Sequence, residues 1–90
     1  MQKLEKEIKK IIQSIKLGYY FDAHTVISLL LQKHHDVYLL GSKNYTSTRL
    51  YHAAISRMVK ANTGLVKNIG KSYSKNVLDK FSGCHLWQRK

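Results

Sequence analysis

The chain has 90 residues, 43% of them hydrophobic, with no proline and a single cysteine, Cys84. This length allows one domain with one modest core, and a lone cysteine excludes an internal disulfide and a zinc site made of several thiolates. The 16 lysines and arginines outnumber the five acids and give a formal charge of +11. Because no apolar run is as long as a signal peptide or a membrane span, we expect one soluble, cytoplasmic domain (residues 1–90) without integral membrane association.

The first predicted element is a helix from Lys3 to Leu17, within an N-terminal amphipathic segment (residues 1–18). Its apolar residues recur at spacings of three and four, as on one face of a helix, and they are Leu4, Ile8, Ile11, Ile12 and Ile15. Gly18 then offers a left-handed stop. The apolar stripe could face the core, a second copy of the chain in a homodimer, or a membrane surface.

A second helix is predicted to start at Asp22, whose side chain can cap free backbone N–H groups. Phe21 and Val26 are spaced to pack on each other across this start, and Val26, Ile27, Leu30 and Leu31 form the buried stripe. The short apolar run from Val37 to Leu40 ends at Gly41 and could be a brief strand or one helical turn. A loop is expected from Gly41 to Tyr45.

The third predicted helix spans residues 46–62 and has two contrasting faces. Its apolar face carries Leu50, Tyr51, Ala54, Ile55 and Met58. Its opposite face is basic and rich in small residues, and it carries Arg49, His52, Ala53, Ser56, Arg57 and Lys60. One side of this helix is therefore predicted to pack on the core while the other faces solvent or a ligand.

The last part of the chain predicts a two-stranded hairpin. Residues 65–69 and 84–88 are rich in branched and aromatic residues and are the expected strands. Between them, residues 70–83 are polar and basic and are expected to form a loop that carries Lys71, Tyr73 and Lys75. The fold class is thus α+β and mainly α.

The charge is unevenly distributed along the chain. Residues 1–42 hold six bases and four acids, whereas residues 43–90 hold ten bases and one acid. A nearly neutral half joined to a basic half indicates one part that packs and another that faces a polyanion. The alternative is that the charge only keeps the domain in solution.

In element order and charge, residues 22–90 resemble the winged helix-turn-helix family of DNA-binding domains. The resemblance implies a three-helix winged-helix-like domain with a C-terminal two-stranded hairpin, preceded here by an extra N-terminal helix. It also implies that helix 46–62 enters the major groove of duplex DNA. The 70–83 loop would then contact the DNA backbone or the minor groove.

We therefore predict a small basic DNA-binding protein with a regulatory or accessory role. An arginine can bond guanine O6 and N7 in the major groove, and lysines suit phosphate contacts. His52 could donate to phosphate, Ser56 permits close approach, and Tyr73 could stack on an unpaired base. The predicted nucleic-acid-binding residues are Arg49, His52, Ser56, Arg57, Lys60, Lys71, Tyr73 and Lys75.

The sequence gives little sign of catalysis or of a cofactor. It has no paired carboxylates, no glycine-rich phosphate loop and no histidines at metal-ligand spacing, since His34 and His35 are adjacent. No catalytic residue, metal ligand or cofactor is therefore predicted. The alternatives that stay open are a protein-interaction module for an acidic partner and a small RNA-binding protein or ribonuclease toxin.

Overall fold

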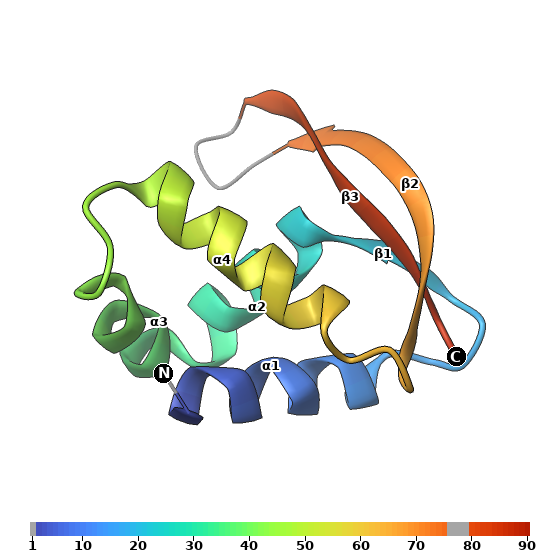
Figure 1. Cartoon of the computed structure of the whole chain (residues 1–90), viewed down its shortest axis with the longest axis horizontal. Coiled ribbons are helices and arrows are strands. Elements are labelled where there is room, and N and C mark those ends of the chain that lie inside the picture. Colours follow the sequence, from blue (N-terminus) through green and yellow to red (C-terminus); the bar gives the residue numbers. More distant parts are fainter. Residues whose placement is uncertain (1, 76–79) are drawn as a thin grey trace.

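The computed structural model describes residues 2–75 and 80–90, which form four helices and three strands (Figure 1). The α+β class is confirmed, with about half of the residues in helices. In chain order the elements are α1 (Gln2–Ser14), β1 (Tyr20–Asp22), α2 (Ala23–Lys33), α3 (His35–Ser42), α4 (Thr48–Lys60), β2 (Val66–Lys75) and β3 (Phe81–Arg89).

The three strands form one antiparallel sheet with the order β1-β3-β2. Strand β1 pairs Phe21 with Trp87, and the two rings lie with centroids 5.7 Å apart in the core. Strand β1 was not predicted, because its three residues are too few to show the alternation that identifies a strand. The sheet therefore has one strand more than the predicted hairpin.

Helix α1 is part of the core and not an addition to it. Leu4, Ile8, Ile11 and Ile12 are all buried, in the same cluster as Trp87. Figure 1 shows α1 running beneath α2 and α4 along one side of the molecule. The predicted helix is confirmed as far as Ser14, short of its expected end at Leu17, and Ile15 lies outside it and half-buried. The other four residues of the apolar stripe pack inside the chain, so they are not available for a homodimer or a membrane surface.

Helix α2 begins as its capping pattern predicts. The Asp22 carboxylate accepts a hydrogen bond of 2.9 Å from the backbone N of Thr25, and both Phe21 and Val26 are buried. The undecided run after α2 is helical, because α3 extends from His35 to Ser42. Gly41 thus lies within α3, where the predicted loop was expected to begin.

Helix α4 begins at Thr48 after an N-cap at Ser47, within the predicted range. Its buried face consists of Tyr51, Ala54, Ile55 and Val59. The prediction that Leu50 belongs to this face is wrong, since 47% of Leu50 is exposed. Each helical residue is rotated by about 100° from the one before it. The buried face is centred on Tyr51 and Ile55, so this rotation places Leu50 at its edge, where the side chain reaches solvent.

The hairpin strands are longer than predicted, and much of the expected 70–83 loop is strand. Lys71, Tyr73 and Lys75 lie on β2, and β3 starts at Phe81. Residues 76–79 of the predicted loop lie outside the described residues. The extension was not visible because its inward positions, such as Ser72 and Ser74, are polar like the outward ones and give no hydropathy alternation.

Candidate nucleic-acid interface

A hollow of about 840 Å³ lies between the outward face of α4 and the hairpin. Six of the eight predicted nucleic-acid-binding residues line it. Helix α4 contributes Arg49, His52, Ser56, Arg57 and Lys60, and β2 contributes Lys71. The fold therefore brings together groups that the sequence places on a helix and on a separate hairpin.

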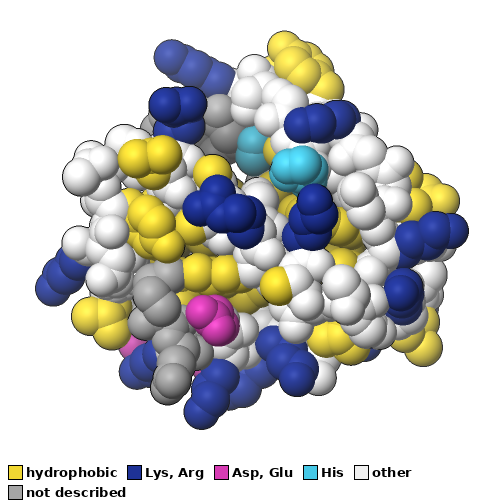
Figure 2. All heavy atoms as spheres, viewed as in Figure 1, with side chains coloured by type: hydrophobic (Ala, Val, Ile, Leu, Met, Phe, Trp, Pro, Cys, Tyr) yellow, Lys and Arg dark blue, Asp and Glu magenta, His cyan; other side chains and the backbone are white. Residues whose placement is uncertain are grey.

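The charge of the hollow is positive. Arg49, Arg57, Lys60 and Lys71 are exposed, and no acidic side chain of the described residues lines the hollow. Figure 2 shows lysine and arginine side chains over much of this face and its rim, some of them beside the histidines near its centre, with an acidic side chain below these. Such a concentration of one sign of charge attracts polyanions and raises their rate of association.

The basic face of α4 also allows close approach of a ligand. Ala53 is exposed and Ser56 half-buried, and both lie between Arg49 and Arg57 along the helix. Side chains this small leave the backbone of the helix near the surface. The two arginines therefore extend from a shallow face on which a groove of nucleic acid can rest.

His52 differs from the basic residues around it. Its Nε2 lies 2.7 Å from the Tyr38 hydroxyl, and the ring is partly buried. Burial, and to a smaller extent the nearby His24, hold the pKa of His52 below its ordinary value. His52 is therefore neutral at neutral pH, which makes it a weaker phosphate donor than the sequence suggests.

Tyr73 and Lys75 do not line the hollow and lie further along β2. The Tyr73 ring stacks on Phe81 with a centroid distance of 5.7 Å, and Lys75 Nζ lies 5.8 Å from the centre of the Phe81 ring. Both aromatic rings are largely exposed, 73% for Tyr73 and 56% for Phe81. They form an aromatic pair on a basic hairpin, separate from the hollow.

A polar cluster behind the hollow joins the hairpin to the start of α2. The Asp22 carboxylate accepts hydrogen bonds from Ser72 (3.1 Å) and Ser74 (2.8 Å), and His24 Nδ1 lies 2.7 Å from Ser74 Oγ. Only the capping role of Asp22 was predicted. Its bonds to Ser72 and Ser74 were not, because these serines lie 50 and 52 residues further along the chain. These bonds hold the hairpin against the start of α2.

The cluster also affects the ionisation of Asp22. Burial alone raises the pKa of Asp22, but hydrogen bonds from Thr25, Ser74 and Ser72 together outweigh burial and leave the pKa below its ordinary value. The carboxylate is therefore charged at neutral pH. It is a buried anion close to a surface that is otherwise basic.

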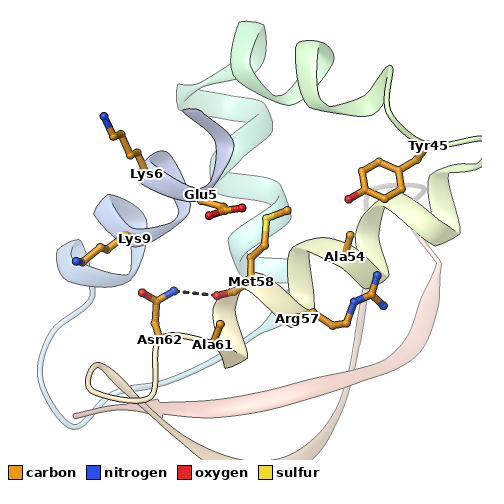
Figure 3. A pocket seen from close by; sticks show the side chains of 9 residues that line it. All are labelled: Glu5, Lys6, Lys9, Tyr45, Ala54, Arg57, Met58, Ala61 and Asn62. Carbon is orange, nitrogen blue, oxygen red and sulfur yellow. Dashed lines mark hydrogen bonds between the residues drawn. The ribbon is translucent and has the colours of Figure 1, made fainter. Parts of the chain in front are cut away.

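A second, smaller hollow of about 560 Å³ lies between α1 and α4 (Figure 3). Glu5, Lys6 and Lys9 border it from α1, and Met58 and Asn62 border it from the other side. Its mixture of acidic and basic side chains makes it less suited to a polyanion than the first hollow. We therefore place the candidate interface on the hairpin side of α4.

Comparison of this chain with protein-family models, curated proteins and solved structures gave no match. Within the described residues, no helix combines the length and the apolar character that crossing a membrane requires.

Proposed function

We propose that this chain is a small DNA-binding protein of the winged-helix type, regulatory or accessory in role. In this proposal α4 lies in the major groove and the hairpin contacts the backbone. One observation carries the proposal: the exposed basic face of α4 and Lys71 of the hairpin border the same acid-free hollow. The order of a capped helix, a short helix, a basic helix and a hairpin supports the winged-helix interpretation.

The dimensions of α4 suit a major groove. Its 13 residues make a helix about 20 Å long, and the groove is about 12 Å wide. Arg49 and Arg57 are separated by about 12 Å along the helix axis, close to the rise of three to four base pairs. Both arginines can therefore reach base edges within one binding site.

The basic residues have different roles in this arrangement. Arg49 and Arg57 bond base edges, where an arginine can bind guanine through two hydrogen bonds. Lys60 and Lys71 contact phosphates, which position the protein without reading the sequence. The small side chain of Ser56 lets the DNA approach the helix closely. His52, which is neutral at neutral pH, holds α4 against α3 through its hydrogen bond to Tyr38.

Selection of binding sites from a random duplex library, followed by titration at several salt concentrations, tests this proposal. Arg49→Ala/Arg57→Ala should remove the preference for the selected site over random duplex. Lys71→Ala/Lys75→Ala should weaken binding to both duplexes alike, because phosphate contacts do not depend on sequence.

A matched control is Lys10→Ala/Lys33→Ala, which removes two charges from residues that line neither hollow. This variant should bind like the wild type. If the wild type does not bind duplex DNA even at low salt, the proposal is wrong. Preference for single-stranded RNA over every duplex would instead favour the RNA-binding alternative.

A further inference from the structure

Three side chains that commonly bind metals meet behind the hollow, and two of them, His24 and Cys84, also line it. The carboxylate of Asp22, a ring nitrogen of His24 and Cys84 Sγ all lie within 4.8 Å of one another. They come from different elements, since Asp22 ends β1, His24 lies in the first turn of α2 and Cys84 lies on β3. None of the three residues is exposed.

The position of Ser74 shows that these groups converge on one point. Ser74 Oγ lies 2.8 Å from Asp22 Oδ2, 2.7 Å from His24 Nδ1 and 4.0 Å from Cys84 Sγ. One hydroxyl group thus lies close to all three potential ligands. Convergence of a carboxylate, an imidazole and a thiol on a common centre is what a metal site requires.

The donor types fit Zn²⁺. In proteins Zn²⁺ is bound tetrahedrally by Cys, His and Asp at about 2.0–2.3 Å, which places ligand atoms about 3.3–3.6 Å apart. The largest separation of 4.8 Å therefore has to shorten by roughly 1 Å. Binding therefore requires the three side chains to move together by this amount. The thiol favours Zn²⁺ over Mg²⁺ and Ca²⁺, which prefer oxygen ligands alone.

The charges also fit a divalent cation. The Asp22 carboxylate and a Cys84 thiolate together carry two negative charges, which balance those of the ion. Because binding releases the thiol proton, the ion adds one net positive charge, and not two, to a chain that already carries +11. A site made only of neutral ligands would be opposed by the surrounding lysines and arginines.

Outer hydrogen bonds already orient two of the ligands. The backbone N and the hydroxyl of Thr25 both donate to Asp22 Oδ1 at 2.9 Å, which directs Oδ2 to the cluster. Ser74 donates to Asp22, so His24 Nδ1 donates to Ser74 in the structure, and binding of the ion at Nδ1 moves the ring proton to Nε2, where Ser82 Oγ lies 3.3 Å away as an acceptor. Bonds of this kind fix the tautomer and the orientation of metal ligands.

We propose that Asp22, His24 and Cys84 bind one Zn²⁺ ion, with the Ser74 hydroxyl or a water molecule as the fourth ligand. The ion links β3 to the start of α2 and so holds the hairpin wall of the hollow against the helices. The site does not depend on the proposed DNA binding, because all its ligands belong to this chain.

Titration of the metal-free full chain with Co²⁺, in the presence of a reductant that is not a thiol, tests this proposal. We expect one ion per chain, with the visible spectrum of tetrahedral Co²⁺ and a sulfur-to-cobalt charge-transfer band in the near ultraviolet. Added Zn²⁺ should abolish both. Cys84→Ser should lose the charge-transfer band, and His24→Ala should weaken binding at least about tenfold.

The control is His35→Ala, which removes an exposed histidine of α3 outside the cluster and should leave Co²⁺ binding unchanged. The weak spectrum of octahedral Co²⁺ without a sulfur band would overturn the proposal, as would unchanged affinity in His24→Ala. If Cys84→Ser does not fold, the rate at which Cys84 of the wild type is alkylated tests the proposal instead. Bound Zn²⁺ should slow this reaction. A rate that Zn²⁺ does not change would also overturn it.

Discussion

Gly41 lies in α3, where this helix packs closely on α1 and α4. A Cβ at this position would lie 2.6 Å from the hydroxyl oxygen of Tyr51 and 3.0 Å from Leu4 Cδ2. Tyr51 is buried, and its hydroxyl donates a hydrogen bond of 2.6 Å to the carbonyl of Tyr38, so it cannot easily move aside. Gly41→Ala should lower the free energy of unfolding by about 1–3 kcal/mol, although alanine favours helices.

Urea unfolding measures this change, and Gly64→Ala is the matched control. A Cβ at Gly64 meets nothing within 4 Å, so this variant should be as stable as the wild type within about 0.5 kcal/mol. Equal stability of Gly41→Ala and the wild type would mean that α3 does not pack as closely as described.

Asp22 combines the N-cap of α2 with hydrogen bonds to the hairpin. Asp22→Ala removes the acceptor of bonds from Thr25, Ser72 and Ser74, and we expect it to cost about 2 kcal/mol of stability. Urea unfolding in the presence of a metal chelator measures this loss apart from any effect of Zn²⁺. The control Asp36→Ala removes an exposed acid and should change stability by no more than about 0.5 kcal/mol.

The same side chain contributes a pH dependence with a defined sign. The pKa of Asp22 in the folded chain lies below the ordinary value of 3.8, so the folded state favours the charged form. Its contribution is fully present at neutral pH and is lost as the pH falls below 3.8 through the folded pKa. The stability difference between the wild type and Asp22→Ala should therefore shrink in acid, and a constant difference would contradict this assignment.

Among the elements, the long amphipathic helices were predictable. The short elements, and the strands with polar residues on both faces, were not. Helices α1 and α4 each repeat apolar residues at helical spacing over 13 residues, enough to identify them. Strand β1 and helix α3 are too short for a period to be read. The hairpin strands carry polar residues on both faces, because the inward serines bond Asp22 instead of packing in the core.

The part of the candidate interface that lies on a single helix, α4, could be predicted from the sequence. The basic face of α4 could be read from its spacing, and Lys71 from its local charge. The cluster of Asp22, His24 and Cys84 could not be predicted, because its members meet only when β3 pairs with β1. Residues that are brought together by strand pairing show no shared pattern of hydropathy in the sequence.

The aromatic pair on the hairpin leads to a prediction about unpaired bases that is separate from the proposed duplex binding. Tyr73 and Phe81 are exposed rings on a basic strand pair, and such rings can stack on unpaired bases. Tyr73→Ala/Phe81→Ala should weaken binding to single-stranded DNA about tenfold while stability changes little. Tyr19→Ala/Tyr20→Ala removes two other exposed rings and should have no effect on fluorescence titrations with such DNA.

On the scale of the whole molecule, size limits the amount of nucleic acid that one copy can cover. The domain measures 33 × 28 × 20 Å. Its longest dimension is close to one turn of duplex DNA, which is about 34 Å. If the proposed function is right, one copy is expected to read a few base pairs in one groove and to contact the phosphates on either side of it. We expect about six phosphates to be neutralised.

The salt dependence of binding follows from this number. Release of counterions from about six phosphates predicts that log K falls with log salt concentration with a slope of about −5. Lys60→Gln/Lys71→Gln removes two charges from the border of the hollow and should flatten the slope by nearly 2. Lys10→Gln/Lys33→Gln lowers the net charge equally but away from the hollow, and it should leave the slope unchanged. If both pairs flatten the slope equally, the basic surface acts through total charge alone, and the hollow between α4 and the hairpin is not the binding site.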